Sequence, residues 1–398
     1  MNEAVIVDAV RTPIGKFMGS LSQVRPDDLA AHTIKTLMER NELDLSLPED
    51  VFFGCANQAG EDNRNVARMS LLLAGLPETV PGATVNRLCG SGMEAVNQAY
   101  AAIKTGLGEM YISGGTESMT RAPYVTMKPQ LSGPRGNQTM YDTTIGWRLV
   151  NEKLAEIYPP ISLGETAENV AEKYGVSREE QDEFALNSQM KTKQAVENNR
   201  FKEEIVPISV KQKKEKIVFN QDEHFRPNAT LEKLAKLKPA FRENGTVTAG
   251  NSSGINDGSS ALLVLNQKRA EELGIKPMVR IVSAAVAGID PSYMGLGPIP
   301  AVKKALKRAN LTVKDLDLIE INEAFASQSI ACINELGLDI SKVNVNGGAV
   351  ALGHPLGCSG ARIMTTLVHE MQKRDCRYGL ATMCIGVGQG IATIVEKI

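Results

Sequence analysis

Apolar runs alternate along this chain with segments whose apolar residues recur at helical spacing. Residues 4–10 (AVIVDAV) form the first apolar run, and a further short run ends just before Asn86. The amphipathic pattern of a helix follows in residues 93–106 (MEAVNQAYAAIKTG) and again in residues 177–199. Short apolar runs are typical of strands and helical spacing is typical of helices. Their alternation therefore predicts a layered α/β protein.

The second half of the chain resembles the first. Similar segments are 4–13 and 279–288, 50–60 and 317–326, 83–96 and 343–362, 109–118 and 378–390, and 259–266 and 389–398. The pattern in each half predicts strand, helix, strand, helix, strand, strand. Self-similarity of this kind indicates an internal duplication, so we expect two similar halves that pack about a pseudo-twofold axis.

The segment between the two copies breaks this pattern. We therefore predict an N-terminal half made of residues 1–119 and 251–274, an inserted loop region of residues 120–250, and a C-terminal half of residues 275–398. Within the insertion, residues 202–242 hold ten Lys or Arg against six Asp or Glu. This charged stretch is either a solvated loop or a lid over an anionic ligand, since insertions at the rim of an α/β scaffold often set substrate choice.

Composition excludes several classes of function. The net charge of −2 predicts no general affinity for nucleic acid, and no apolar run approaches the roughly 20 residues of a membrane helix. The N-terminal residues are typical of a first strand and lack the basic and apolar regions of a targeting signal. The six cysteines include no CxxC pair and no metal-type spacing, so we expect reduced thiols in a cytoplasmic protein without a metal.

Cys89 is the first candidate for chemistry. It lies in NRLCGSGM, between the apolar run and the helical pattern of residues 93–106. The N-terminus of a helix carries partial positive charge and depresses the pKa of a thiol, and Gly90 and Gly92 permit another backbone or a substrate to come close. A buried structural cysteine is the alternative.

Three further segments hold candidate residues. His354 lies in the glycine-rich turn GGAVALGHPLGCSGAR before a helical pattern and is the best base of the four histidines, or else an exposed turn residue. Cys384 ends a strand in MCIGVGQG and is either reactive or a packed strand residue. Asn322 and Glu323 follow the apolar run DLIEI, where they either cap a helix or orient a water or an oxyanion. The repeat places these segments at corresponding ends of two related sheets, where two thiols, a His and an Asn would form a site for carbon chemistry.

Together these segments resemble the thiolase family, the acetyl-CoA C-acyltransferases, over the whole chain. The resemblance implies a duplicated αβαβα fold with an inserted loop domain, and cleavage of 3-ketoacyl-CoA through an acyl group on Cys89. It further implies that His354 is the base and that Cys384 exchanges the proton at the α-carbon. Asn322 would hold a water for one oxyanion hole with His354, and the N–H groups of Cys89 and Gly386 would form the other.

The resemblance also implies partners and substrates. Coenzyme A would be a substrate, with no permanently bound cofactor, and would contact Leu163, Arg226, Phe241, Ala249 and Ser253. The assembly would be a homodimer or homotetramer. Residues 159–169 (PPISLGETAEN) lack the His-Met pair of acetoacetyl-specific members, which favours a broader degradative enzyme. Residues 53–77 and 141–151 (YDTTIGWRLVN) resemble 3-oxoadipyl-CoA thiolases of aromatic catabolism.

Other functions remain as alternatives. A biosynthetic acetoacetyl-CoA thiolase differs from the degradative enzyme only in its substrate. A ketoacyl synthase would have His or Asn in place of Cys384, and a non-catalytic acyl-CoA carrier would be expected to lack one of the four candidate side chains. The GNSSG motif of residues 250–254 matches the serine-hydrolase GxSxG, but the INDGSS that follows is a poor helix start.

Overall fold

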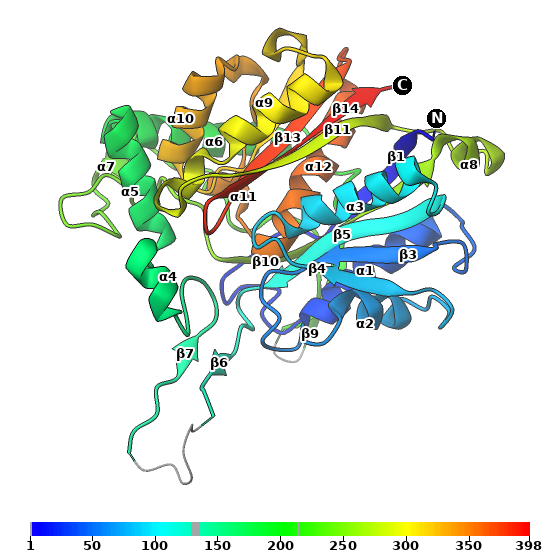
Figure 1. Cartoon of the computed structure of the whole chain (residues 1–398), viewed down its shortest axis with the longest axis horizontal. Helices are drawn as coiled ribbons and strands as arrows, with labels where there is room; N and C mark the ends of the chain where they lie inside the picture. The colour runs from blue at the N-terminus through cyan, green and yellow to red at the C-terminus, as the bar shows by residue number, and fades with distance from the viewer. Residues whose placement is uncertain (1, 129–135, 213–214) are drawn as a thin grey trace.

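Strands from both ends of the sequence meet in the middle of the computed structural model, which describes residues 2–128, 136–212 and 215–398 (Figure 1). The main sheet runs in the order β12-β13-β14-β11-β1-β10-β5-β3-β4, with β2 paired to β10. Its strands are β1 (Ala4–Arg11), β2 (Gly15–Lys16), β3 (Asp50–Gly54), β4 (Gly82–Val85), β5 (Met110–Ser118), β10 (Asn256–Asn266), β11 (Val279–Gly288), β12 (Leu318–Ile321), β13 (Tyr378–Ile385) and β14 (Gln389–Lys397).

Strand pairing confirms the internal duplication. In the N-terminal half β3 is parallel to β5, and β5, β10 and β1 follow in antiparallel order. In the C-terminal half β12 is parallel to β13, and β13, β14 and β11 follow in the same antiparallel order. The halves join where Val5 pairs with Arg280 and Ile6 with Val279. The division into three parts with the predicted boundaries stays a prediction.

Helices lie on both sides of each half-sheet. Helices α1 (Pro26–Arg40) and α2 (Val66–Leu73) pack on the outer face of the N-terminal half, and α9 (Pro298–Ala309) and α10 (Ala326–Leu336) on that of the C-terminal half. Helices α3 (Ser91–Thr105) and α12 (Leu356–Lys373) contact each other and strands of both halves. The predicted αβαβα layering is therefore confirmed.

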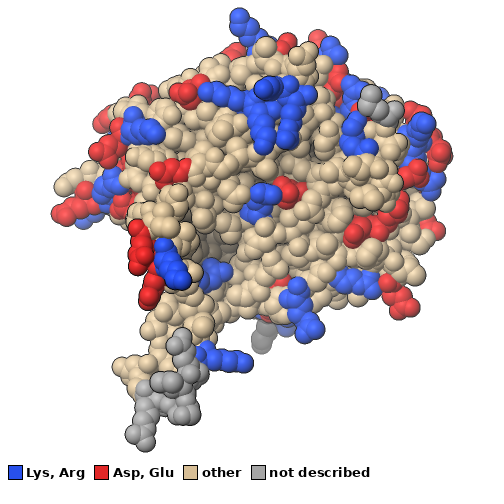
Figure 2. Space-filling view, in the orientation of Figure 1, with Lys and Arg blue, Asp and Glu red and all other residues tan. Residues whose placement is uncertain are grey.

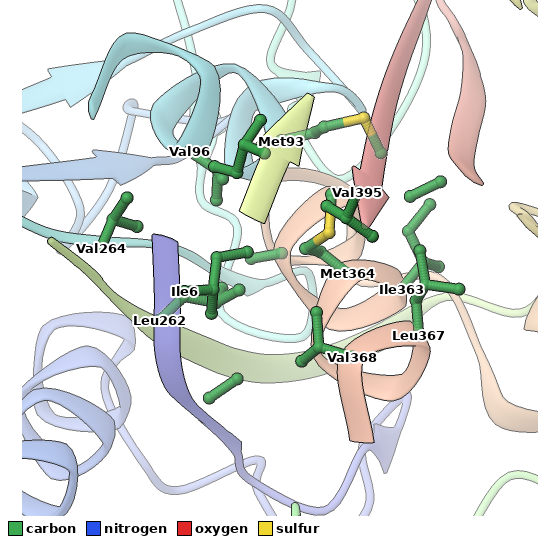
Figure 3. Close-up of a cluster of buried hydrophobic side chains, with 14 of the residues drawn as sticks. Ile6, Met93, Val96, Leu262, Val264, Ile363, Met364, Leu367, Val368 and Val395 are labelled. Carbon is green, nitrogen blue, oxygen red and sulfur yellow. The ribbon is translucent and has the colours of Figure 1, made fainter. Parts of the chain in front are cut away.

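The central core lies around α3 and α12 (Figure 3). Ile6, Leu262 and Val264 reach it from the N-terminal strands, whereas their neighbours Val5 and Leu263 point to the outer cluster. This alternation follows from the two-residue period of a strand buried on both faces. Helices α3 and α12 touch through glycines: a Cβ on Gly92 would lie 2.8 Å from the backbone of Gly357 and Ala361.

The inserted region contributes smaller elements, and the segment with β6 and β7 extends away from the body of the molecule (Figure 1). The elements are β6 (Tyr124–Val125), β7 (Tyr141–Asp142), α4 (Glu152–Ile157), α5 (Leu163–Tyr174), α6 (Arg178–Glu197), β8 (Ile208–Gln212), β9 (Glu215–Phe219) and α7 (Leu231–Ala235). The helix predicted over residues 177–199 is α6, which begins with a capping box at Ser177. Short α8 (Gln267–Glu272) and α11 (Ala349–Leu352) complete the α-helices of the described residues.

Part of the charged stretch is buried, so a fully solvated loop is the wrong description of residues 202–242. Arg11 of β1 pairs with Glu204 at 2.6 Å and with Asp222 at 2.7 Å, and all three side chains are buried. Acidic and basic residues are otherwise mixed over the face in Figure 2, apart from a basic cluster over α9 (PIPAVKKALKRA). No helix within the described ranges is long and apolar enough to cross a membrane.

Candidate active site

Four loops bring the candidate side chains to the ends of the central helices. Cys89 precedes α3, and His354 lies between α11 and α12. Asn322 follows β12, and Cys384 is the penultimate residue of β13. All four side chains are buried, and a cavity of about 460 Å³ reaches Cys89.

The Cys89 thiol lies against the turn between β13 and β14. Burial raises the pKa of Cys89 to about 11, although the backbone N–H of Gly386 donates a hydrogen bond to the sulfur, which lowers the pKa; the Glu117 carboxylate adds a smaller increase. The expected depression of this pKa at the helix N-terminus is therefore wrong, because burial outweighs the local donors. The backbone N–H of Gly386 contacts the Cys89 sulfur, and its role as an oxyanion donor stays a prediction.

His354 is held on both sides. Its backbone N–H donates to the side chain of Asn256 at 3.0 Å, and its Nδ1 lies 2.6 Å from the hydroxyl of Ser359. The side-chain amide of Asn322 lies 3.4 Å from Nε2. Burial, followed by the nearby Arg362 guanidinium, lowers the pKa of His354 to about 3, so the imidazole is neutral at physiological pH.

The buried side chain of Asn322 has a hydrogen-bond acceptor that no described residue occupies. Its Oδ1 is buried and has no hydrogen-bond partner among the described residues. A buried polar atom of this kind fits a bound water, which is what the oxyanion interpretation requires. The helix-cap interpretation is wrong, because α10 begins later, with Phe325 at its N-cap. Glu323 instead accepts hydrogen bonds from Ser188, Asn344 and the N–H of Val350.

Cys384 faces an apolar cluster with Met294, Ala324 and Phe325. Burial raises the pKa of Cys384 well above its ordinary value, and a charge on Cys89 raises it further. Two thiols that oppose each other's ionisation lie close together. Both are therefore protonated in the resting protein, so one can give a proton while the other attacks carbon.

The cavity beside Cys89 is mostly apolar. It is lined by Ala56, Asn57, Leu88, Cys89, Thr143, Thr144, Ile145, Gly146, Trp147, Arg148, Leu149, Ile161, Leu163, Leu356, Gly386 and Val387. The inserted region supplies the segment 143–149, and the two halves supply the loops around Cys89 and Gly386. A mostly apolar cavity with a few polar groups is typical of a small-molecule site.

The residues predicted to contact coenzyme A fall into two groups. Leu163 lines the cavity, and Phe241 packs edge-on against Phe325 with their ring centroids 6.1 Å apart. Ser253 donates its backbone N–H to Ala324, beside Phe325, and Ala249 is exposed in the preceding loop. Arg226 is exposed and borders a different hollow with Lys16 and His224. The structure therefore brings Leu163, Phe241 and Ser253 toward the site and leaves Arg226 further out.

Three further residues support the site and were not predicted from the sequence. Ser359 and Asn256 hold His354, and the buried Glu117 accepts hydrogen bonds from the N–H groups of Ala56, Asn57 and Gly357. Ser359 follows His354 by five residues, so the turn-to-helix pattern offered a signal for it. Asn256 and Glu117 lie on strands far in sequence from the residues that they contact, so no local pattern reveals them.

The structure argues against a metal site and against a serine-hydrolase site. Cys55, Asp62 and Glu117 are the described group whose ligand atoms could surround a metal, within 4.8 Å of one another, but backbone N–H groups already occupy the Glu117 oxygens. The GxSxG interpretation is wrong, because Ser252 is followed by strand β10 and donates its hydroxyl to the carbonyl of Thr248.

Comparison with known proteins gives matches over the whole chain. Residues 4–268 match the family "Thiolase, N-terminal domain" and residues 275–397 match "Thiolase, C-terminal domain". A beta-ketoadipyl-CoA thiolase of Pseudomonas aeruginosa is 55% identical, over 100% of this chain and 99% of that protein. A 3-oxoadipyl-CoA/3-oxo-5,6-dehydrosuberyl-CoA thiolase of Escherichia coli is 54% identical over 100% of both chains. The crystal structure of human mitochondrial 3-ketoacyl-CoA thiolase superposes with a TM-score of 0.94 at 41% identity, over 100% of this chain and 99% of that one.

Proposed function

This chain belongs to the thiolase family, and from that premise we propose that its substrate is a 3-oxoacyl-CoA whose acyl chain ends in a carboxylate, as in 3-oxoadipyl-CoA. The class of the enzyme is an acyltransferase that cleaves 3-ketoacyl-CoA with coenzyme A. The observation that carries the choice of substrate is the identity of 54–55% over the full chain with relatives named for that thioester.

The first half-reaction begins at Cys89. Its sulfur attacks the C3 carbonyl of the substrate while its proton passes to His354, because the resting thiol and imidazole are both neutral. The C2–C3 bond then breaks, and Cys384 gives its proton to C2. Acetyl-CoA leaves, and the shortened acyl group stays on Cys89 as a thioester.

Hydrogen-bond donors would stabilise the charge that develops on each carbonyl oxygen. The backbone N–H groups of Cys89 and Gly386 would hold the thioester oxygen of the acyl-enzyme, which lies beside the sulfur that they already contact. A water on Asn322, together with His354, would hold the oxygen of the departing enolate. Preorganised donors of this kind commonly contribute about 10²–10³-fold to the rate.

The second half-reaction regenerates the resting enzyme. Coenzyme A gives its thiol proton to the Cys384 thiolate, and its sulfur attacks the acyl group on Cys89. The Cys89 thiolate then recovers its proton from His354, so every proton is accounted for. We place coenzyme A along Leu163, Phe241, Ala249 and Ser253 with Arg226 at the outer end. No permanently bound cofactor enters this scheme, and each half-reaction completes without the other's substrate, which gives ping-pong kinetics.

The assembly is proposed to be a homodimer or homotetramer in the cytoplasm. Large apolar side chains on and beside the β6–β7 segment are exposed in the single chain, among them Tyr124, Met127 and Met140. Clustered exposed apolar surface is typical of an interface. Light scattering after size-exclusion chromatography measures the state directly, and a monomer at micromolar concentration would contradict the proposal.

The choice of substrate is tested by comparing kcat/KM for three thioesters. These are 3-oxoadipyl-CoA, 3-oxohexanoyl-CoA, which carries a methyl group where the former has its carboxylate, and acetoacetyl-CoA. We expect 3-oxoadipyl-CoA to exceed both by at least about tenfold, equivalent to one charge-assisted contact in the transition state. A preference for acetoacetyl-CoA would instead favour the biosynthetic alternative, and a preference for 3-oxohexanoyl-CoA a general fatty-acyl enzyme.

A further inference from the structure

Arg148 is the charged side chain of the cavity beside Cys89. Of all the described residues that line this cavity, it alone carries a formal charge at neutral pH. It is half-buried, and no ion pair or side-chain hydrogen bond joins it to another described residue. A guanidinium that borders an apolar cavity and has no acidic partner can bind an anionic group of a ligand there.

The other polar groups of the cavity are already occupied. The amide of Asn57 donates to the carbonyl of Thr143 at 3.0 Å and to its hydroxyl at 3.1 Å. That hydroxyl donates in turn to the carbonyl of Pro123 at 2.6 Å, and the hydroxyl of Thr144 bonds to Asp142. Arg148 is thus the polar side chain of the described lining that retains its donors for a ligand.

A neighbour of Arg148 in the sequence links its segment to another part of the cavity wall. The indole N–H of Trp147 donates to the carbonyl of Ile161 at 3.1 Å, which ties this segment to the loop before α5. This hydrogen bond keeps the segment that carries Arg148 beside Ile161, which also lines the cavity.

From these observations we propose that Arg148 binds the terminal carboxylate of the acyl chain. This inference rests on the proposed function and adds the residue that would confer it. After cleavage of 3-oxoadipyl-CoA, the group on Cys89 is a succinyl chain, whose carboxylate lies only two methylene groups from the thioester. So short a chain keeps the charge inside the cavity, where an unpaired carboxylate would be strongly disfavoured. A planar guanidinium can bind both carboxylate oxygens at once.

The test compares Arg148→Gln with wild type on 3-oxoadipyl-CoA and 3-oxohexanoyl-CoA. We expect kcat/KM for 3-oxoadipyl-CoA to fall about 10–100-fold and that for 3-oxohexanoyl-CoA to change less than about twofold. Arg148→Lys should retain part of the preference, because it keeps the charge but loses the paired donors. Lys153→Gln, an exposed basic residue of α4 outside the cavity, is the matched control and should behave as wild type.

A second assay measures only the formation and breakdown of the acyl-enzyme. Exchange of labelled coenzyme A into succinyl-CoA requires only acylation and deacylation of Cys89, and butyryl-CoA is its uncharged counterpart. Arg148→Gln should slow the exchange of succinyl-CoA selectively and leave that of butyryl-CoA as in wild type. Because both thioesters share coenzyme A, a contact between Arg148 and the CoA moiety would slow both exchanges equally.

The possible outcomes distinguish failure of the Arg148 role from failure of the proposed substrate. If wild type prefers 3-oxoadipyl-CoA but Arg148→Gln affects the charged and uncharged substrates alike, or affects neither, Arg148 does not bind the carboxylate while the proposed function stands. If wild type shows no preference for 3-oxoadipyl-CoA, the proposed function fails and this inference fails with it. Thermal unfolding of each variant verifies that it is folded.

Discussion

At the scale of single residues, burial controls the chemistry. Cys89 lies where a helix N-terminus would favour the thiolate, yet its pKa is raised to about 11, and the pKa of His354 is lowered to about 3. A resting thiolate–imidazolium pair would pay two desolvation penalties, so the neutral pair prevails. The proton must therefore move as the sulfur attacks, with the substrate in place.

The lowered pKa of His354 predicts a loss of stability in acid. Between its ordinary value of 6.5 and about 3, the unfolded chain binds a proton on this imidazole and the folded chain does not. The free energy of unfolding therefore falls as the pH drops through this window, by at most about 1.4 kcal/mol per pH unit from this group. Urea unfolding measured at about pH 7.5, 6.0 and 5.0 gives the slope of the unfolding free energy with pH.

The matching variant is His354→Asn, which removes the titrating group. It should flatten the pH dependence between about pH 6.5 and pH 5 relative to wild type. His224→Gln is the comparison. Burial lowers the pKa of His224 to about 4, so its removal should also reduce the dependence of the unfolding free energy on pH in this range. An unchanged slope in His354→Asn would mean that this imidazole is not neutralised by the fold.

The types of chemical group in the site could be predicted from the sequence, but their ionisation could not. Cys89, His354, Cys384 and Asn322 each stand out in a glycine-rich or strand-end context. The direction of the Cys89 pKa depends instead on how completely neighbouring elements remove water, which no local pattern encodes. Asn256 was missed for a related reason: the residue that it positions lies in another part of the chain.

At the scale of elements, the junction of α3 and α12 fixes the distance between Cys89 and His354. Each residue precedes one of these helices, and the helices approach through Gly92 and Gly360. A Cβ on Gly360 would lie 2.4 Å from the backbone N of Met93, so neither glycine leaves room for a side chain. Gly92 and Gly360 therefore permit close packing of the two helices, as the sequence suggested for Gly92.

Gly92→Ala is expected to destabilise the protein and slow catalysis together. The added methyl group meets backbone atoms that cannot rotate away, which costs about 1–3 kcal/mol of unfolding free energy. It also displaces the thiol from its base, so kcat should fall more than KM changes. Urea unfolding and steady-state thiolysis measure the two effects.

Gly288→Ala is the control for that substitution. Its nearest neighbour would be 3.9 Å from the new Cβ, so stability should change by less than about 0.5 kcal/mol. If Gly92→Ala matched Gly288→Ala in stability and in kcat, the close approach of α3 and α12 would not govern the site.

At the scale of the whole molecule, the site is asymmetric because equivalent positions of the two copies carry different side chains. Glu117 and Cys384 occupy corresponding places in the two half-sheets, each opposite a glycine of the next antiparallel strand, Gly258 and Gly390. Cys384 faces the cluster beside the cavity, whereas Glu117 binds backbone N–H groups. One copy thus retains a side chain suited to proton transfer, and the other copy anchors the loops that surround it.

The layered duplication could be predicted from the sequence because each half repeats the same local pattern. The docking of the insertion could not be predicted, because Arg11 meets Glu204 and Asp222 across about half of the chain's length. Charge runs such as residues 202–242 usually indicate solvated surface, and nothing in their local sequence distinguishes the buried Asp222 from its exposed neighbours.

This buried ion cluster predicts a large effect of Arg11→Met on stability. The substitution leaves the carboxylates of Glu204 and Asp222 buried without their cation, which costs about 3–5 kcal/mol of unfolding free energy. Arg269→Met is the matched control, because the Arg269–Glu272 pair is partly exposed and contributes about 0.5 kcal/mol or less. Equal urea midpoints for the two variants would show that the insertion does not depend on Arg11.

The most direct measurement of the proposed mechanism is the mass of the protein after reaction with 3-oxoadipyl-CoA in the absence of free coenzyme A. We predict one added succinyl group, found by peptide mapping on Cys89, together with an equal amount of released acetyl-CoA and no adduct in Cys89→Ser. Release of acetyl-CoA without an adduct, or a succinyl group on another residue such as Cys384, would contradict the acyl-Cys89 intermediate.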